Sequence, residues 1–314
     1  IVFISAVVDA QVINSEFIIP QNGITLFYIM NLGVPAIIVY LATYYFINGL
    51  NIEKSKNAEL LALTSQKNQE ILASIRYAKR IQSAILPPDK VVKEYLHESF
   101  ILYKPKDIVA GDFYWLEQKN GKTLFAVADC TGHGVPGAIV SVICNAALNS
   151  SVREFGLTDP GQILDKTRDI IVEEFEQSIE DVKDGMDIAL CTLEGDDLRF
   201  AGAHNPLWIM RSGKLIQIQG DKFSIEKFHN NYAFKTHSFD LEKGDTLYIF
   251  SDGFVDQFGG EMGKKFKTRR FKALLLGMQD ESMEKQKELI DYAFENWRGI
   301  GEQVDDVCVI GVRI

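Results

Sequence analysis

The 314-residue sequence has few of the residues that build soft-metal sites and disulfides, with only 4 cysteines and 5 histidines. Cys130, Cys144, Cys191 and Cys308 lie far apart and form no CxxC pair. This spacing argues against a zinc ribbon or a disulfide framework. We interpret all four as reduced core residues of a cytosolic domain.

Positive charge is also scarce, because 33 Lys and Arg stand against 43 Asp and Glu, for a net charge of -10. A general nucleic-acid binder needs basic surface to hold phosphate backbones, so we expect no nucleic-acid partner. The excess of acid lies in residues 91–314, and an acidic surface suits divalent cations. The sequence also lacks a P-loop, a GxSxG and an HExxH motif.

A long run without charge lies near the N-terminus, between Glu16 and Glu53, and Ile24–Ile47 within it is mostly apolar. A helix needs about 20 such residues to cross a bilayer. Lys and Arg follow this run and none precedes it, so the positive-inside rule predicts that everything after residue 50 is cytoplasmic. The alternative is a buried helix of a soluble domain, although core helices seldom run this long without charge.

Four segments are predicted along the chain. Residues 1–23, which begin with Ile rather than Met, are interpreted as the end of a truncated upstream region, and residues 24–50 as a transmembrane helix. Residues 51–88 are expected to form a helical signalling linker, because they contain no Gly or Pro before Pro87 and Pro88. Residues 89–314 remain for one large domain.

The linker shows a partial heptad pattern over its second half. Apolar or small residues keep a 4-3-4-3 spacing that includes one glutamine, at Ile71, Ile75, Ala78, Gln82 and Ile85. This spacing favours a coiled coil and a homodimer formed through residues 52–86. The alternative is a single amphipathic helix packed on the following domain.

From residue 99 the sequence changes to short β-branched and aromatic runs separated by turns. Strands are expected over 100–103, 112–117, 123–129, 188–193, 198–203, 207–211, 215–219, 246–251 and 307–312. Helices are expected over 135–149, 160–178 and 282–297, the second opened by Asp159 as N-cap with Pro160 in its first turn. Because strands and helices do not alternate regularly, the pattern predicts an α+β domain of packed sheets with outer helices.

Two of the expected strands end in the same unusual way, on an aspartate followed by a small residue. Thr123–Asp129 reads TLFAVAD, and Thr246–Asp252 reads TLYIFSD. A carboxylate at the end of a buried strand must be compensated, and neither strand has a Lys or Arg nearby. Either aspartate alone is more often part of a turn, but together they suggest a divalent cation as the partner.

Further carboxylates fit the same site. Asp112 lies in AGDFYW, and Asp305 and Asp306 immediately precede the last apolar strand. Carboxylates without a His or Cys set describe a hard oxygen-ligand site for Mg²⁺ or Mn²⁺ rather than Zn²⁺. Two such ions bridged by one aspartate would activate water against a phosphoryl group, so the predicted chemistry is phosphoester hydrolysis.

The order of the motifs GDFYW, ADCTGHGVPGA, AGAHNP, GDTLYIFSDG and the final DD pair carries a resemblance. The chain resembles the SpoIIE-type branch of the metal-dependent protein phosphatase (PPM, phosphatase 2C-like) superfamily. The match covers roughly residues 76–314 and includes YAKRIQSAILPP, which is similar to the lead-in helix of RsbU-like members. It implies a phosphatase 2C-like β-sandwich of two packed sheets flanked by helices, here preceded by a transmembrane helix and a helical linker, with the SpoIIE-type domain over 89–314.

The resemblance also implies roles for individual residues around two Mn²⁺ or Mg²⁺ ions. Asp129 is expected to bridge both ions, and the backbone carbonyl of Cys130 to bind one of them. Asp252 and Asp305 are expected to complete the shell of the other ion. Asp112 matches the acidic residue that reaches the metals directly or through water.

Two further aspartates are left with open roles. Asp306 substitutes for Asp305 as a ligand or supports it. Asp187, in GMDIAL, serves a third and weaker metal or caps a strand.

The sequence departs from the wider superfamily at the expected catalytic histidine. The phosphatase 2C pattern has a His two residues after the bridging Asp, where this chain has Thr131, so general acid catalysis by His133 is not expected. Gly132, His133 and Gly134 either form a tight turn or contact the phosphate at a helix N-terminus. His204 is expected to order a turn, and the phosphate-binding Arg of the superfamily has no clear counterpart.

The resemblance implies hydrolysis of phosphoserine or phosphothreonine on a regulatory phosphoprotein, often a STAS-type anti-sigma-factor antagonist. The enzyme would then be the cytoplasmic output domain of a signalling protein in a bacterial plasma or inner membrane. The first alternative is a pseudophosphatase acting as a membrane-tethered binding module, and the second is a nucleotide cyclase. Residues 258–266 are interpreted as a mobile, partly basic flap, in which Lys264 and Lys265, with the nearby Lys267, meet an acidic protein substrate.

Overall fold

The computed structural model describes residues 20–176, 184–226 and 232–314. Most of the predicted upstream region and the last two residues of the expected helix 160–178 therefore lie outside the described residues. The chain divides into two compact units, residues 1–72 and 73–314.

The first unit is helical throughout its described part. It contains α2 (Gln21–Tyr28), a π-helical turn η1 (Ile29–Gly33) and most of α3 (Val34–Ile85). The irregular turn lies directly before Pro35, which lacks the N–H that a regular helix needs. An 18-residue stretch of this helix is long and apolar enough to cross a membrane, and none of it is buried. This finding rests on length and composition, so the transmembrane span stays a prediction.

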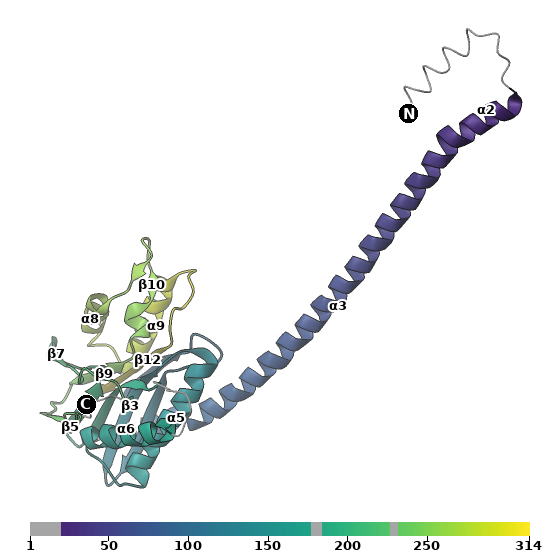
Figure 1. Cartoon of the computed structure of the whole chain (residues 1–314). Coiled ribbons are helices and arrows are strands. Elements are labelled where there is room, and N and C mark those ends of the chain that lie inside the picture. The colour runs from purple at the N-terminus through teal and green to yellow at the C-terminus, as the bar shows by residue number, and fades with distance from the viewer. Residues whose placement is uncertain (1–19, 177–183, 227–231) are drawn as a thin grey trace. The chain divides into compact units, whose positions relative to one another are not determined.

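Two five-stranded antiparallel sheets form the core of the second unit (Figure 1). The first sheet has the order β1 (Glu98–Lys104), β12 (Val307–Arg313), β9 (Thr246–Phe250), β6 (Leu207–Arg211) and β7 (Lys214–Ile218). The second has the order β2 (Phe113–Lys119), β3 (Lys122–Cys130), β4 (Met186–Glu194), β5 (Asp197–Ala203) and β8 (His237–Asp240). A separate pair consists of β10 (Phe258–Gly259) and β11 (Lys264–Lys265).

Helices cover the outer face of each sheet. The helices α5 (Gly134–Arg153) and α6 (Pro160–Glu176) pack on the second sheet, and α8 (Thr268–Gly277) and α9 (Met283–Arg298) pack on the first. The strands are thus buried on both faces, which explains why β3 and β9 read as continuous apolar runs rather than alternating ones. The α5 helix is also long and apolar enough for a membrane span, but more than half of its apolar stretch is buried in this core.

The predicted α+β sandwich of two packed sheets with outer helices is confirmed. All nine expected strands are present with small shifts at their ends, and Asn120, Gly195 and Ser212 have positive φ angles in the turns between paired strands. The sequence missed β8, α8 and the short helices α4 (Asp89–Tyr95) and α7 (Gly253–Asp256). The β8 strand is a short edge strand with exposed polar residues, so it lacks the apolar signal of the others.

The end of α3, from Ala73 to Ile85, belongs to the second unit and packs on the rest of it. Gln82 is buried, and Ile75, Ala78 and Ile85 on the same helix face are half-buried, whereas Ile71 is exposed. Over the last turns this placement agrees with the alternative of a helix packed on the domain, and the coiled coil stays a prediction. A dimer through the upstream part of residues 52–86 stays a prediction.

Candidate active site

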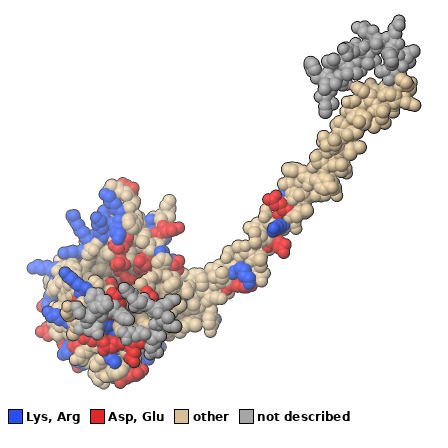
Figure 2. Space-filling model, viewed as in Figure 1, with Lys and Arg blue, Asp and Glu red and all other residues tan. Residues whose placement is uncertain are grey.

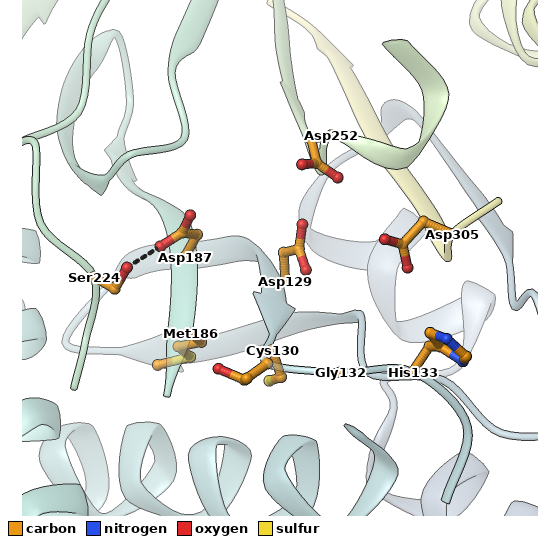
Figure 3. A pocket seen from close by; sticks show the side chains of 10 residues that line it. Asp129, Cys130, Gly132, His133, Met186, Asp187, Ser224, Asp252 and Asp305 are labelled. Carbon is orange, nitrogen blue, oxygen red and sulfur yellow. Dashed lines mark hydrogen bonds between the residues drawn. The ribbon is translucent and has the colours of Figure 1, made fainter. Parts of the chain in front are cut away.

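Aspartates from both sheets meet at one end of the sandwich. Asp129 ends β3 in the second sheet, whereas Asp252 follows β9 and Asp305 precedes β12 in the first sheet. Because β9 and β12 are antiparallel neighbours, the end of one lies beside the start of the other. The three carboxylates line one cavity of about 260 Å³ and point toward one another (Figure 3). The remaining lining residues are Cys130, Thr131, Gly132, His133, Met186, Asp187 and Ser224.

The electrostatics of this cavity are dominated by uncompensated negative charge. Burial raises the pKa of Asp129 to about 8, and the charges of Asp252, Asp305 and Asp187 add to the rise. Loss of hydration also raises the pKa of Asp252, the charges of Asp256 and Asp305 add to the rise, and the charge of Lys265 opposes it. Among the residues that the structure describes, no Lys or Arg lines the cavity. Such a set of carboxylates is strongly stabilised by bound cations.

Asp112 is buried close to Asp129 of the cavity. Its side chain is only 2 % exposed, and its Oδ2 accepts a hydrogen bond from Ser251 Oγ at 2.5 Å. Burial and the neighbouring Asp129 raise the pKa of Asp112 well above its ordinary value. Asp112 does not line the cavity itself. Its expected reach to the metals, directly or through water, stays a prediction.

The structure separates the two aspartates of the DD pair. Asp305 lines the cavity, whereas Asp306 does not. The two carboxylate oxygens of Asp306 accept hydrogen bonds from the backbone N–H groups of Lys106 and Gly111, each at 2.7 Å. The predicted role of Asp306 as a direct metal ligand disagrees with this placement, because both of its oxygens hold the segment that carries Asp112.

Two glycines allow the backbones of the motifs to pack together. A Cβ at Gly111 would collide with the carbonyl oxygen of Gly132 and lie 3.1 Å from that of Cys130. A Cβ at Gly253 would collide with the carbonyl oxygen of Asp306. The glycines of AGD and SDG are therefore needed for close approach of neighbouring segments rather than for turns.

The last turns of α3 also contact the segment that carries Asp112. The Nε2 of Gln82 donates to the carbonyl of Ala110 at 2.6 Å and to Ser141 Oγ at 2.9 Å. Its Oε1 accepts from the N–H of Ala110 at 3.1 Å. A residue two positions before Asp112 is thus fixed on both of its backbone polar groups by the helix that follows the predicted span.

His133 is held between two charged residues that the sequence reading missed. Its Nδ1 lies 3.0 Å from Asp107 Oδ2, and its Nε2 lies 3.0 Å from Lys106 Nζ. An ammonium only donates, so Nε2 accepts from Lys106 and Nδ1–H donates to Asp107. The run KPKD directly before the AGD motif was the available sequence signal. Thr131, at the position of the expected histidine, exchanges hydrogen bonds with the backbone of Gly185.

Asp187 and His204 are the two remaining candidates from the sequence. Asp187 lines the cavity opposite Asp129 in the β3–β4 register, and its Oδ1 accepts from Ser224 Oγ at 2.6 Å (Figure 3). Both of its predicted roles remain compatible with this place. His204 lies outside the cavity, in the turn between β5 and β6 with a φ of 55°, as expected for a residue that orders the turn.

The donor set of the cavity fits a hard divalent cation. Among the described residues, no three His, Cys, Asp or Glu side chains are grouped closely enough to hold one ion by themselves. The cavity instead offers separate carboxylates, from Asp129, Asp252 and Asp305, and the backbone of Cys130. Oxygen donors spread around a cavity suit Mg²⁺ or Mn²⁺, which keep several water ligands, better than Zn²⁺.

Comparisons with known proteins agree with this arrangement. A family model described as Stage II sporulation protein E (SpoIIE) matches residues 119–314. Phosphoserine phosphatase RsbU of Bacillus subtilis (strain 168) is 25% identical over 191 residues, which cover 60% of this chain and 55% of RsbU. The chain thus spans about half the length of this curated relative.

Solved structures show the same fold. The SiaA-PP2C domain of Pseudomonas aeruginosa has a TM-score of 0.72 and 32% sequence identity, covering 79% of this chain and 98% of that domain. The PP2C phosphatase domain of SpoIIE from Bacillus subtilis, with a fragment of its regulatory domain, has a TM-score of 0.57 and 19% identity. It covers 69% of this chain and 62% of that structure, and it is a likeness of fold alone.

Proposed function

Because this chain belongs to the SpoIIE family of PP2C-like proteins, we propose that its second unit is a protein serine/threonine phosphatase. The reaction is hydrolysis of phosphoserine or phosphothreonine on a regulatory protein. The observation that carries the proposal is the convergence of Asp129, Asp252 and Asp305 on one cavity, where no Lys or Arg of the described ranges lines the wall beside them.

The proposed cofactor is a pair of Mn²⁺ or Mg²⁺ ions. Asp129 would bridge them, Asp252 and Asp305 would bind one, and the carbonyl of Cys130 would bind the other. When bound, two such ions supply the positive charge that activates water and stabilises the transferring phosphoryl group. Asp112 would orient this site from its buried position, and Asp306 would hold the backbone that positions Asp112.

Protein groups must also bind the substrate phosphate besides the metals. We assign this phosphate binding to Lys106 and to the backbone N–H groups of Gly132, His133 and Gly134 at the start of α5, where a helix N-terminus favours an anion. His133 positions the Lys106 ammonium, because Asp107 fixes its ring with Nε2 toward the lysine. Lys106 thus takes the place of the arginine that the sequence lacks.

The proposed cellular context follows the domain order. Residues 24–50 would anchor the chain in a bacterial plasma membrane, and residues 51–88 would pass a signal to the cytoplasmic phosphatase domain, residues 89–314. Exposed apolar side chains such as Ile38, Tyr45 and Phe46 support the anchor, because water would not solvate such a surface favourably. A STAS-type anti-sigma-factor antagonist is the proposed class of substrate.

The test uses the full chain in detergent micelles. We would measure phosphate release from p-nitrophenyl phosphate and from a phosphoserine peptide with Mn²⁺ or with EDTA. Asp252→Asn is compared with Asp280→Asn, an exposed aspartate outside the cavity. We expect activity in Mn²⁺, loss in EDTA and in Asp252→Asn, and no loss in Asp280→Asn.

Two results would contradict the proposal. Activity that survives EDTA or Asp252→Asn would refute the metal mechanism. A folded chain with no turnover of either substrate in Mn²⁺ would favour the pseudophosphatase alternative, a membrane-tethered binding module.

A further inference from the structure

A dense group of positive charges follows the Asp252 motif in a chain that is otherwise acidic. Residues 264–272 read KKFKTRRFK and contain no acidic residue, although the whole chain has a net charge of -10. We call this stretch the basic segment; its charged residues are Lys264, Lys265, Lys267, Arg269, Arg270 and Lys272. In Figure 2, Lys and Arg side chains gather where Figure 1 places β10 and α8, and red acidic side chains lie next to them.

Most of these charges are not neutralised within the protein. Lys265 pairs with Asp256 at 2.6 Å, and the guanidinium of Arg270 stacks 4.5 Å from the centre of the Trp297 ring. The other four side chains, Lys264, Lys267, Arg269 and Lys272, are exposed and form no ion pair with any residue that the structure describes. Like charges this close repel one another, so the free surface favours a negative partner.

The basic segment is anchored to the turn that carries Asp252. The N–H of Lys267 donates to the carbonyl of Val255 at 2.7 Å, and the N–H of Phe266 donates to the carbonyl of Gln257 at 2.9 Å. Phe266 is buried, with its ring 5.1 Å from that of Phe254. The positive surface is therefore held beside the turn that carries Asp252. Within residues 258–266, interpreted from the sequence as a mobile flap, Phe258–Gly259 and Lys264–Lys265 form the β10–β11 pair.

The basic segment and the acidic cavity together match one kind of ligand. Lys265 pairs with Asp256, which ends the short helix α7 that begins directly after Asp252, so the two surfaces adjoin. A phosphoserine that enters the cavity brings the flanking residues of its own chain onto the neighbouring surface. Carboxylates at those flanking positions would find the unpaired ammonium and guanidinium groups, whereas basic residues would be repelled.

We propose that the basic segment is a docking surface for acidic residues that flank the phosphoserine of a protein substrate. This inference rests on the proposed phosphatase function and adds the charge class of the substrate. An anionic membrane surface is the competing ligand for such a patch, but the anchorage of the segment to the Asp252 turn favours the substrate.

The experiment compares peptides and charge-reversed variants in the full chain in detergent micelles. Three phosphoserine peptides share one sequence, except that their flanking residues are Glu, Gln or Lys. The test variant is Lys264→Glu with Arg269→Glu and Lys272→Glu. The matched control is Lys90→Glu with Lys214→Glu and Lys243→Glu, three exposed lysines without ion-pair partners in the described part of the chain.

With Mn²⁺ we expect kcat/KM for the Glu peptide to exceed that for the Gln peptide by about tenfold at low salt, since several exposed charge pairs each contribute modestly. The preference should shrink at high salt because the Debye length falls. The test variant should lose it, and the control should keep it. Unchanged turnover of p-nitrophenyl phosphate would show that the test variant is folded and that its metal site is intact.

Peptide binding without turnover separates this inference from the proposed function. Fluorescence anisotropy in EDTA measures the affinity of the labelled Glu peptide even if the chain has no phosphatase activity. We expect the test variant, and not the control, to bind it several-fold more weakly. Equal binding of the Glu, Gln and Lys peptides by the wild-type chain, or unchanged Glu-peptide binding by the test variant, would overturn the proposal.

Reconstitution tests the lipid alternative. The chain is placed in phosphatidylcholine vesicles with or without phosphatidylserine, and energy transfer is measured from its tryptophans to a dansyl-labelled lipid. We expect phosphatidylserine to change the transfer equally in the wild-type chain and in the test variant. A rise in the wild-type chain alone, together with unchanged peptide binding, would assign the surface to the membrane and reject the docking proposal.

Discussion

Replacing Gln82 by alanine tests whether the end of α3 holds the segment of the candidate active site. The side chain is 5 % exposed and makes three hydrogen bonds, two of them to the backbone of Ala110. Alanine would leave the buried N–H and C=O of Ala110 without these partners. A buried polar group without a partner costs about 1–3 kcal/mol, so we expect Gln82→Ala to lower the free energy of unfolding by about 2–3 kcal/mol.

This loss is large enough to measure by thermal unfolding. For a domain of this size, 1 kcal/mol shifts Tm by roughly 2–4 °C, so the expected decrease is roughly 5–10 °C. Tryptophan fluorescence reports it in detergent micelles, because Trp115, Trp208 and Trp297 all lie in the second unit. We also expect Gln82→Ala to need a several-fold higher Mn²⁺ concentration for half-maximal activity, since Ala110 precedes the Gly111–Asp112 pair.

The matched control is Gln66→Ala, the same substitution on an exposed part of the same helix, where the glutamine bonds only to the exposed Glu70. Its Tm should stay within about 2 °C of wild type, because exposed substitutions usually change stability by less than about 0.5 kcal/mol. The reasoning would be wrong if Gln82→Ala and Gln66→Ala unfolded at the same temperature. It would also be wrong if Tm fell as expected but the Mn²⁺ requirement did not change, since Gln82 would then be structural only.

Three further predictions concern the cavity. Because the pKa of Asp129 is raised to about 8, the metal-free native state keeps a proton that the unfolded chain releases near pH 4. The Tm of the chain in EDTA should therefore fall as the pH rises from about 4 to 8. A Tm that rises over this pH range would contradict the prediction. Gly253→Ala should lower Tm by several degrees and weaken Mn²⁺ activation, because the new Cβ would collide with the carbonyl oxygen of Asp306. The control Gly277→Ala should change neither, because a Cβ at Gly277 meets open space. Lys106→Met should raise KM for a phosphoserine peptide several-fold without changing the Mn²⁺ requirement, because Lys106 is proposed to bind the phosphate. The control Lys90→Met should change neither quantity. An unchanged KM in Lys106→Met would show that Lys106 does not bind the substrate phosphate.

The sequence predicted the sandwich well because its inner strands are buried on both faces. Runs such as 123–129 and 246–250 have no other stable place than between two packed layers. The edge strand β8 was missed because it is only four residues long, its alternate positions are only half-buried, and its exposed residues are polar. The helix α8 was missed because the basic residues around it obscured the two buried positions, Phe271 and Leu275, that hold it to the core.

The sequence predicted only those residues of the candidate site that lie at the ends of apolar strands. Asp129 and Asp252 share a local pattern that the sequence displays directly. The choice between Asp305 and Asp306 depends on which neighbour meets the backbone of residues 106–111, a contact almost two hundred positions away along the chain. The hydrogen bond between Lys106 and His133 also depends on how the loop of residues 106–111 folds, so no local spacing in the sequence could predict it.

The origin of the cavity carboxylates from two different sheets has a consequence for metal choice. Asp252 and Asp305 are attached to one sheet and Asp129 to the other, and side chains that include Phe125, Phe200 and Ile249 fill the space between the sheets. In the proposed metal site, this hydrophobic layer would set the separation of the carboxylates that bind the ions. A core substitution that changes the layer by one methylene would then be expected to change the preference between Mg²⁺ and larger ions, although the substituted position touches no metal, water or substrate.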